Sequence, residues 1–270
     1  MIGSDPSDRF YLNSGGIDDE RERRMVFDGV NGAPDKLKNL ENDYAGALQL
    51  LHYAGRMSRN LSDARVNNAF AEDEAGNAAY TASLRQSDLF LVWQRLARDG
   101  SAIALFHFEK TITETANAAA SCLTIAHLVD KQKIEAVRHG LLQFFPNLRD
   151  VRNAICHAAE ASFESTTDKN GRPKKESKRQ RHALKNAKGK YLGGLVDLGD
   201  DADATLFMSG MAAGKQSTYT QEGRVVSIEL SEEGFAKLIE LRRQIYRTLE
   251  AAAKHLTDLG TEKAKRASQG

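Results

Sequence analysis

Apolar residues recur at three- and four-residue intervals over most of the chain, which is the spacing of helices that pack along one face. The stronger of two early runs spans residues 84–120. Gly is a poor helix former, so Asp99-Gly100 predicts a kink or a break in this run. The apolar positions are Leu37, Leu40, Tyr44, Ala47, Leu48 and Leu51 in the first run, and Leu89, Val92, Trp93, Leu96, Ile103, Phe106 and Ile112 in the second.

Later segments predict further helices. Residues 123–148 predict one or two shorter helices that end before Pro146, because the residue before a proline is driven out of the helical region. A new helix is expected over 147–163, with Asn147 as its N-cap. Ser231, followed by Glu232 and Glu233, predicts the start of a last helix.

Polar segments and a change of period mark the remaining parts. Residues 1–33 are polar and Gly-rich and predict an extended or partly ordered arm. Residues 203–230 contain β-branched residues and Gly-containing turns, which predict two or three short strands with a hairpin turn at Glu222-Gly223. The fold class expected is mainly α, with a domain over 34–260, a basic loop at 164–200, a small β-hairpin before the C-terminal helix and a polar tail at 261–270.

Charge is unevenly spread along the chain. Lys plus Arg number 38 and Asp plus Glu number 37, but residues 169–190 hold ten basic residues and only Glu176 as an acid. The rest of the chain has 28 basic against 36 acidic residues. One basic segment on an acidic body suits a polyanion such as nucleic acid. A solvated loop that binds nothing has the same composition, so both interpretations stay open.

Several classes of protein are not expected. The two cysteines, Cys122 and Cys156, are too few for a disulfide framework and indicate buried thiols in a reducing compartment. No run of 18 apolar residues predicts a membrane span, and the start lacks a signal-peptide pattern. A cytoplasmic location is therefore expected. No H-x-x-x-H or C-x-x-C spacing predicts a metal site, and no cofactor is expected.

The segment at 148–160 combines an apolar face with a polar one. Asn153 and His157 are four residues apart and lie above one another on a helix. Arg152 is five residues from His157, about 140° around the axis, but its long side chain can reach the same cleft. A second copy of the chain could also complete the site. The inward positions are Val151, Ile155 and Ala158, and the polar ones are Arg149, Arg152, Asn153, His157 and Glu160.

Arg152-Asn153-Ala154-Ile155-Cys156-His157 matches the R-x4-6-H signature of the HEPN superfamily, including the polar residue that often follows the arginine. The chain resembles this family over about residues 84–165 and the final helix. The resemblance implies a helical bundle that forms a homodimer, with two motifs facing each other in a composite site. It also implies a metal-independent endoribonuclease that leaves a 2′,3′-cyclic phosphate and a 5′-hydroxyl.

The residue types fit that chemistry. A histidine can shuttle protons near pH 7, and an arginine stays charged while it grips phosphate oxygens. Asn153 could orient the phosphate or the imidazole. Cys156 adjoins His157, but neighbouring residues on a helix point about 100° apart, which favours a buried thiol over a nucleophile. RNA contacts are expected from Arg149, Lys174, Lys175, Lys178, Arg179 and Arg181.

The sequence leaves alternatives open for the regulation of the site and for the residues that support the motif. Members regulated by a nucleotide-transferring antitoxin carry a Tyr two residues after the motif histidine, where this chain has Ala159. A toxin, a phage-defence effector or an RNA-processing protein is the nearer comparison, with a neutralising antitoxin or another regulatory partner. Asp99 and His107 could support the motif or could be ordinary structural residues. The alternative function is a non-catalytic dimerisation module that binds RNA or an acidic protein.

Overall fold

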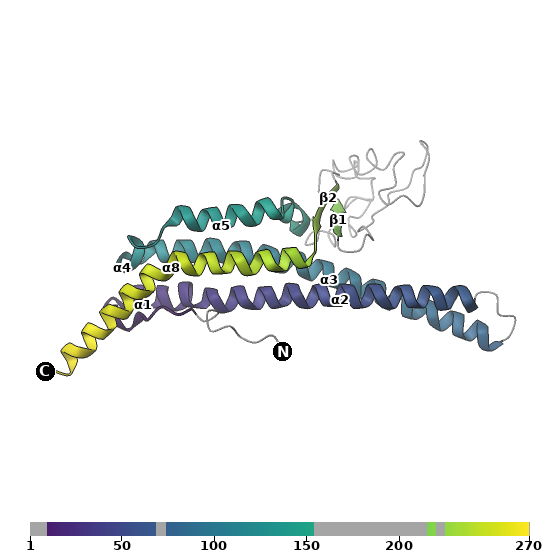
Figure 1. The fold of residues 1–270 in the computed structure, drawn as a ribbon, viewed down its shortest axis with the longest axis horizontal. Coiled ribbons are helices and arrows are strands. Elements are labelled where there is room, and N and C mark those ends of the chain that lie inside the picture. Colours follow the sequence, from purple (N-terminus) through teal and green to yellow (C-terminus); the bar gives the residue numbers. More distant parts are fainter. Residues whose placement is uncertain (1–9, 69–73, 154–214, 220–224, 270) are drawn as a thin grey trace, which may run out of the picture. The chain divides into compact units, whose positions relative to one another are not determined.

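The computed structural model describes residues 10–68, 74–153, 215–219 and 225–269, and these are mainly helical (Figure 1), as the sequence predicts. None of their helices combines the length and the apolar character that a bilayer crossing requires. The helical elements are η2 (Ser14–Gly16), α1 (Glu20–Arg24), η3 (Met25–Asn31), α2 (Gly32–Asn68), α3 (Glu74–Ser121), α4 (Leu123–Ala126), α5 (Lys131–Phe144) and α8 (Glu232–Ala267). The strands are β1 (Lys215–Tyr219) and β2 (Val225–Glu229).

The chain divides into two compact units. Unit 1 consists of the segments Met1–Tyr44, Ala104–Phe145 and Glu232–Gly270, and unit 2 consists of Ala45–Ile103 and Pro146–Ser231. The long helices α2 and α3 each contribute residues to both units.

Unit 1 is organised around α8, which contacts α5, α4 and η2. Figure 1 shows α5 and α4 beside α8. The helix predicted to start after Ser231 is present as α8, and its inward side chains are buried. Gly234 lets α8 approach its neighbours closely. A Cβ there would lie 2.5 Å from the Tyr44 hydroxyl and 3.1 Å from Phe145 Cζ. The buried apolar residues of α8 are Leu238, Leu241, Ile245, Tyr246, Leu249, Ala252 and Leu256.

The sequence predicts an extended or partly ordered arm over residues 1–33, and its described residues are packed and largely helical. The Asn31 side chain pairs with the backbone of Leu12 in both directions, since Leu12 N donates to Oδ1 at 2.7 Å and Nδ2 donates to the Leu12 carbonyl at 2.9 Å. Sequence periodicity misses this packing because the apolar positions are separated by many charged and glycine residues. Four of them are fully or almost fully buried, namely Leu12, Ile17, Val26 and Val30.

Helix α3 differs from expectation in two ways. It runs without a break through Asp99-Gly100, where a kink or break is predicted. Its apolar face also divides, because Ile112 is fully buried while four predicted inward side chains are 37% to 56% exposed. These four are Leu89, Val92, Leu96 and Ile103.

The last helix also runs further than expected. The sequence predicts a polar tail at 261–270, but α8 passes Gly260 and ends at Ala267. Lys263 on this extension bonds Asp18 at 2.6 Å within unit 1. The polar character of the segment therefore reflects an exposed helix.

Within unit 2, an aromatic cluster joins α2 and α3. Phe90 and Trp93 lie edge to face at 5.3 Å, and Tyr53 lies 6.4 Å from the Phe90 ring. The strands β1 and β2 pair antiparallel, with Ser217 opposite Ser227. Both strands fall in the segment predicted to form strands. Its remaining residues before 215 and at 220–224, and the basic loop, lie outside the described residues.

Candidate functional site

The helix that carries the motif arginine begins as predicted after Pro146. Residues 148–153 are helical, and Val151 N donates to the Asn147 carbonyl at 2.9 Å. Leu148 and Val151 are fully buried, which confirms the predicted inward position of Val151. This burial fixes the rotation of the helix about its axis, and with it the direction of Arg152.

Arg152 and Asn153 contact each other. Arg152 Nη1 donates to Asn153 Oδ1 at 3.0 Å, where Arg152 is half-buried and Asn153 is exposed. Arg149, one turn earlier, is also exposed. Three of the residues expected in the site are thus accessible on the first turns of one helix.

The other motif residue, His157, lies outside the described residues, and so do Ile155, Cys156, Ala158 and Glu160. The basic residues expected to bind RNA, Lys174, Lys175, Lys178, Arg179 and Arg181, also lie outside. The convergence of arginine and histidine therefore stays a prediction.

Asp99 and His107, the candidate supporting residues, both lie on α3. Asp99 is half-buried and belongs to unit 2, where its charge acts on the neighbouring Arg98. His107 is exposed and belongs to unit 1, and its ring lies 5.7 Å from Phe106. Their supporting role stays a prediction.

Arg98 is a cation that the sequence does not single out. It is 3% exposed, and its Nη2 donates to Gln94 Oε1 at 3.2 Å. Its Nε is buried without an acceptor in the described part of the chain. Desolvation lowers the pKa of Arg98, while the charge of Asp99 acts in the opposite direction. Arginine is rarely buried, so periodicity gives no signal for such a position.

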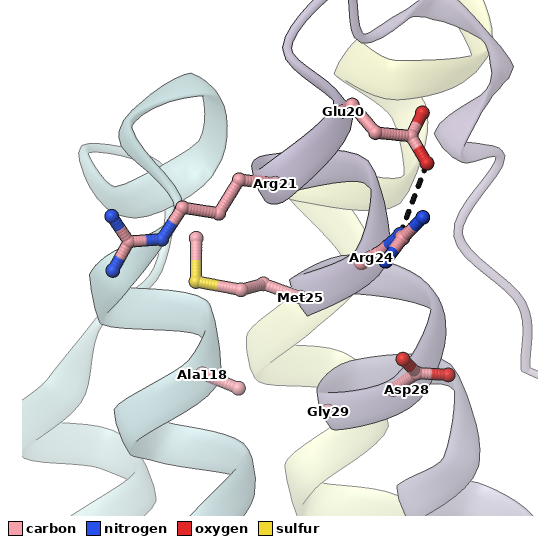
Figure 2. Close-up of a pocket in the computed structure, with 7 residues that line it drawn as sticks. All are labelled: Glu20, Arg21, Arg24, Met25, Asp28, Gly29 and Ala118. Carbon is pink, nitrogen blue, oxygen red and sulfur yellow. Dashed lines mark hydrogen bonds and ion pairs between the residues drawn. The ribbon is translucent and has the colours of Figure 1, made fainter.

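Unit 1 carries an open hollow of about 670 Å³ beside the π-helix η3. Figure 2 shows Arg21 and Met25 extending toward α3, which carries Ala118, while Glu20, Arg24 and Asp28 lie away from it. Gly29 allows η3 to lie close to α3, because a Cβ at this position would lie 2.6 Å from Ala118 Cβ. A second hollow of about 420 Å³ adjoins the first and shares Glu20, Arg24 and Asp28.

The charges of the first hollow are balanced. Arg24 is paired with Glu20 at 3.0 Å. The lining also contains one further acidic residue, Asp28, and one further basic residue, Arg21. Such a surface does not select a polyanion. Among the residues that the structure describes, no cluster of His, Cys, Asp and Glu could hold a metal ion. The hollow therefore gives no independent indication of a catalytic site.

Glu22 ties α1 to the start of α4. Its carboxylate accepts hydrogen bonds from the backbone N of Leu123 at 3.0 Å and of Thr124 at 3.2 Å, and from the Thr124 hydroxyl. The hydrogen bond from the Thr124 hydroxyl is the largest of the interactions that lower the pKa of Glu22. Burial, followed by the Glu22 charge, raises the pKa of the Cys122 thiol. Cys122 is fully buried, which confirms the predicted burial of this thiol.

Comparison with protein-family models, with curated proteins and with solved structures finds no match to this chain.

Proposed function

We propose that the protein is a metal-independent endoribonuclease of the HEPN type. In this mechanism, the 2′-hydroxyl of RNA attacks the adjacent phosphate and expels the 5′-oxygen of the next nucleotide. The products are a 2′,3′-cyclic phosphate and a 5′-hydroxyl. His157 moves the proton and Arg152 stabilises the charge that develops on the phosphorane.

The observation that supports the proposal is the accessible position of Arg152 on its helix. Leu148 and Val151 are buried on one side of the helix, and Arg152 and Asn153 stand on accessible positions beside them. The Arg152 guanidinium donates to Asn153 Oδ1 at 3.0 Å. An arginine held on a rigid helix in this way suits bidentate recognition of phosphate.

The proposal includes partners. RNA is the substrate, and two copies of the chain form the composite site. A toxin or phage-defence effector of this kind would also have a neutralising or regulatory partner. The alternative is a non-catalytic module that pairs and binds RNA or an acidic protein. The alternative keeps Arg152 as a binding residue but predicts no cleavage.

The test is incubation of the purified protein with structured RNA and tRNA in EDTA, followed by end-group analysis. Cleavage with cyclic-phosphate and 5′-hydroxyl ends is expected from the wild type. Arg152→Ala and His157→Ala should each lower the rate by about 100-fold or more, because each removes a group that acts in the transition state.

Matched controls separate the site from general loss of charge. Arg247→Ala and His139→Ala remove the same side-chain types from exposed positions of α8 and α5, and both should cleave RNA like the wild type. Absence of cleavage in the wild type, with retained RNA binding that depends on Arg152, would support the non-catalytic module instead.

A further inference from the structure

One face of α2 in unit 2 carries a row of exposed side chains. The row advances by four, three and four residues, so its members lie within about 60° of one another around the axis at 3.6 residues per turn. The row is about 16 Å long at 1.5 Å per residue. Its exposed residues are Gln49, Tyr53, Arg56 and Asn60.

Tyr53 is held in place by two aromatic rings of α3. Its ring centre lies 6.2 Å from that of Trp93, with the two planes inclined by 30°, and 6.4 Å from that of Phe90 in an edge-to-face arrangement. Phe90 is buried, but Tyr53 is 44% exposed. The tyrosine ring is therefore supported by its neighbours and still accessible from solvent.

The charge along this part of α2 is positive. No acidic residue occurs over residues 44–62, whereas Arg56 and Arg59 are both exposed. Asp88 of α3 is exposed, but it lies about 160° around that helix from Phe90, on the side away from the contact with α2. The surface around the row therefore favours an anionic ligand.

An aromatic ring, a cation and two amides in one row suit single-stranded nucleic acid. Unpaired bases stack on tyrosine, and this stacking tolerates any base because every base has a π-face. A guanidinium group pairs with phosphate oxygens, and amide side chains offer both donors and acceptors to base edges. The bases of a duplex are already stacked and paired, so a duplex cannot use the tyrosine ring.

We propose that this row binds a short stretch of single-stranded RNA, with one base stacked on Tyr53 and a neighbouring phosphate on Arg56. Gln49 and Asn60 contact the nucleotides on either side. The inference goes beyond the proposed cleavage, because the surface does not include Arg152 and requires no reaction. In the proposed nuclease, it would add affinity for the substrate without acting on the reacting phosphate.

The fluorescence of Trp93 tests the location, because it is the only tryptophan of the chain. The probe is oligo(A) RNA with methylated 2′-hydroxyl groups, which the proposed reaction cannot cleave. It should quench Trp93 in the wild type, because a base on Tyr53 lies close to the indole ring. The same oligo(A) annealed to oligo(U) should quench far less at equal concentration.

Substitutions of the aromatic ring test the stacking, with the anisotropy of end-labelled oligo(A) as the measure of affinity. Tyr53→Ala should weaken binding by about tenfold or more, because it removes one base–aromatic stack. Tyr53→Phe keeps the ring and should bind like the wild type. Tyr11→Ala is the matched control, because Tyr11 is 62% exposed in unit 1, and it should also bind like the wild type.

Substitution of the cation tests the phosphate contact without disturbing the aromatic packing. Arg56→Ala should reduce the slope of log affinity against log salt by about 0.7, the value for one phosphate contact on a single strand. Arg247→Ala, an exposed arginine of α8, should leave the slope unchanged. This variant pair tests the surface even if Tyr53→Ala weakens the fold.

A wild type that does not bind the oligo(A), or that binds it without quenching of Trp93, would overturn the proposal. So would equal quenching by the duplex, or an affinity and salt slope that Tyr53→Ala and Arg56→Ala both leave unchanged. Cleavage is not measured in any of these experiments. RNA cleavage without quenching would contradict this surface alone, and binding at this surface without cleavage would contradict the nuclease hypothesis alone.

Discussion

Arg242 Nε lies 2.6 Å from Glu41 Oε1, and each side chain is only 1% exposed. The pair joins α8 to α2 within unit 1, more than 200 residues apart in the chain. The Arg242 guanidinium also lies 5.3 Å from the centre of the Tyr246 ring, and Lys38 Nζ lies 3.9 Å from the second Glu41 oxygen. A charge pair buried in this way is stable only while both partners are present.

Removing one member should therefore destabilise the protein strongly. Glu41→Gln and Arg242→Met should each lower the free energy of unfolding by about 3–5 kcal/mol, because the remaining charge stays buried. Urea unfolding followed by circular dichroism measures this loss. The double variant Glu41→Met/Arg242→Met should lose much less than the sum of the single losses. Additive losses would show that the two charges do not act as a pair.

Gly234 should not tolerate a methyl group. Gly234→Ala places a Cβ against the Tyr44 hydroxyl and Phe145, and overpacking of this kind costs about 1–3 kcal/mol. Gly46→Ala is the matched control within helix α2, because a Cβ there meets nothing within 4 Å. It should stabilise the protein by about 0.5–1 kcal/mol, since alanine loses less backbone entropy than glycine. Thermal unfolding of both variants should give shifts of opposite sign.

Stability should depend on pH through Glu22. Its pKa in the folded protein is lower than the ordinary value of 4.5, so the folded state binds this proton less readily than the unfolded state. Its contribution to stability is fully present above the unfolded pKa and is lost as the pH falls through the folded pKa. Urea unfolding at a series of pH values should show the wild type more stable than Glu22→Gln near pH 7. The difference should shrink in acid, and a difference independent of pH would contradict this account.

Asn153 should position Arg152 for the proposed cleavage. Asn153→Ala removes one hydrogen bond to the guanidinium and should lower kcat by about tenfold, which corresponds to about 1.4 kcal/mol. Asn153→Asp keeps an acceptor and should retain more activity. Single-turnover cleavage of a labelled RNA measures both effects. An unchanged kcat with a raised KM would instead assign Asn153 to RNA binding.

The buried charge of Arg98 is expected to lower the free energy of unfolding. A buried guanidinium bonded to one neutral side chain recovers little of its hydration energy. Arg98→Met keeps a similar volume without the charge and should raise the free energy of unfolding by about 1 kcal/mol. Urea unfolding checks this, and RNA binding of the same variant should be unchanged. Strong destabilisation would indicate that the charge is compensated.

Sequence periodicity predicts helices well where one apolar face is buried. The last helix, the short helices before Pro146 and the inward position of Val151 follow from it. It fails at Leu12 and Val26, because their packing depends on contacts distant in sequence. It also fails at Gly100, where buried neighbours on the same helix outweigh the low helix propensity of glycine.

The candidate site is predictable only in part, for a similar reason. A spacing pattern identifies Arg152 and Asn153, and their hydrogen bond agrees with a shared role. The pattern does not reveal that Arg98 is buried, because a charged residue is expected at the surface. It also gives α3 an apolar face without indicating which of those side chains stay exposed. Leu96 shows the difference, since its outward position depends on how the other side of the helix packs.

The division of unit 1 among three separate segments has a consequence for its synthesis. Residues near Gly16 pack against Gly260, where an added Cβ would lie 2.6 Å from the Gly260 nitrogen, and this contact spans almost the whole chain. During translation the first segment leaves the ribosome well before α8, which follows the other described elements in the chain. The segment Ser14–Gly16, which contacts α8, therefore lacks this neighbour until α8 is made, and a chaperone that binds nascent segments would have most of that time to act.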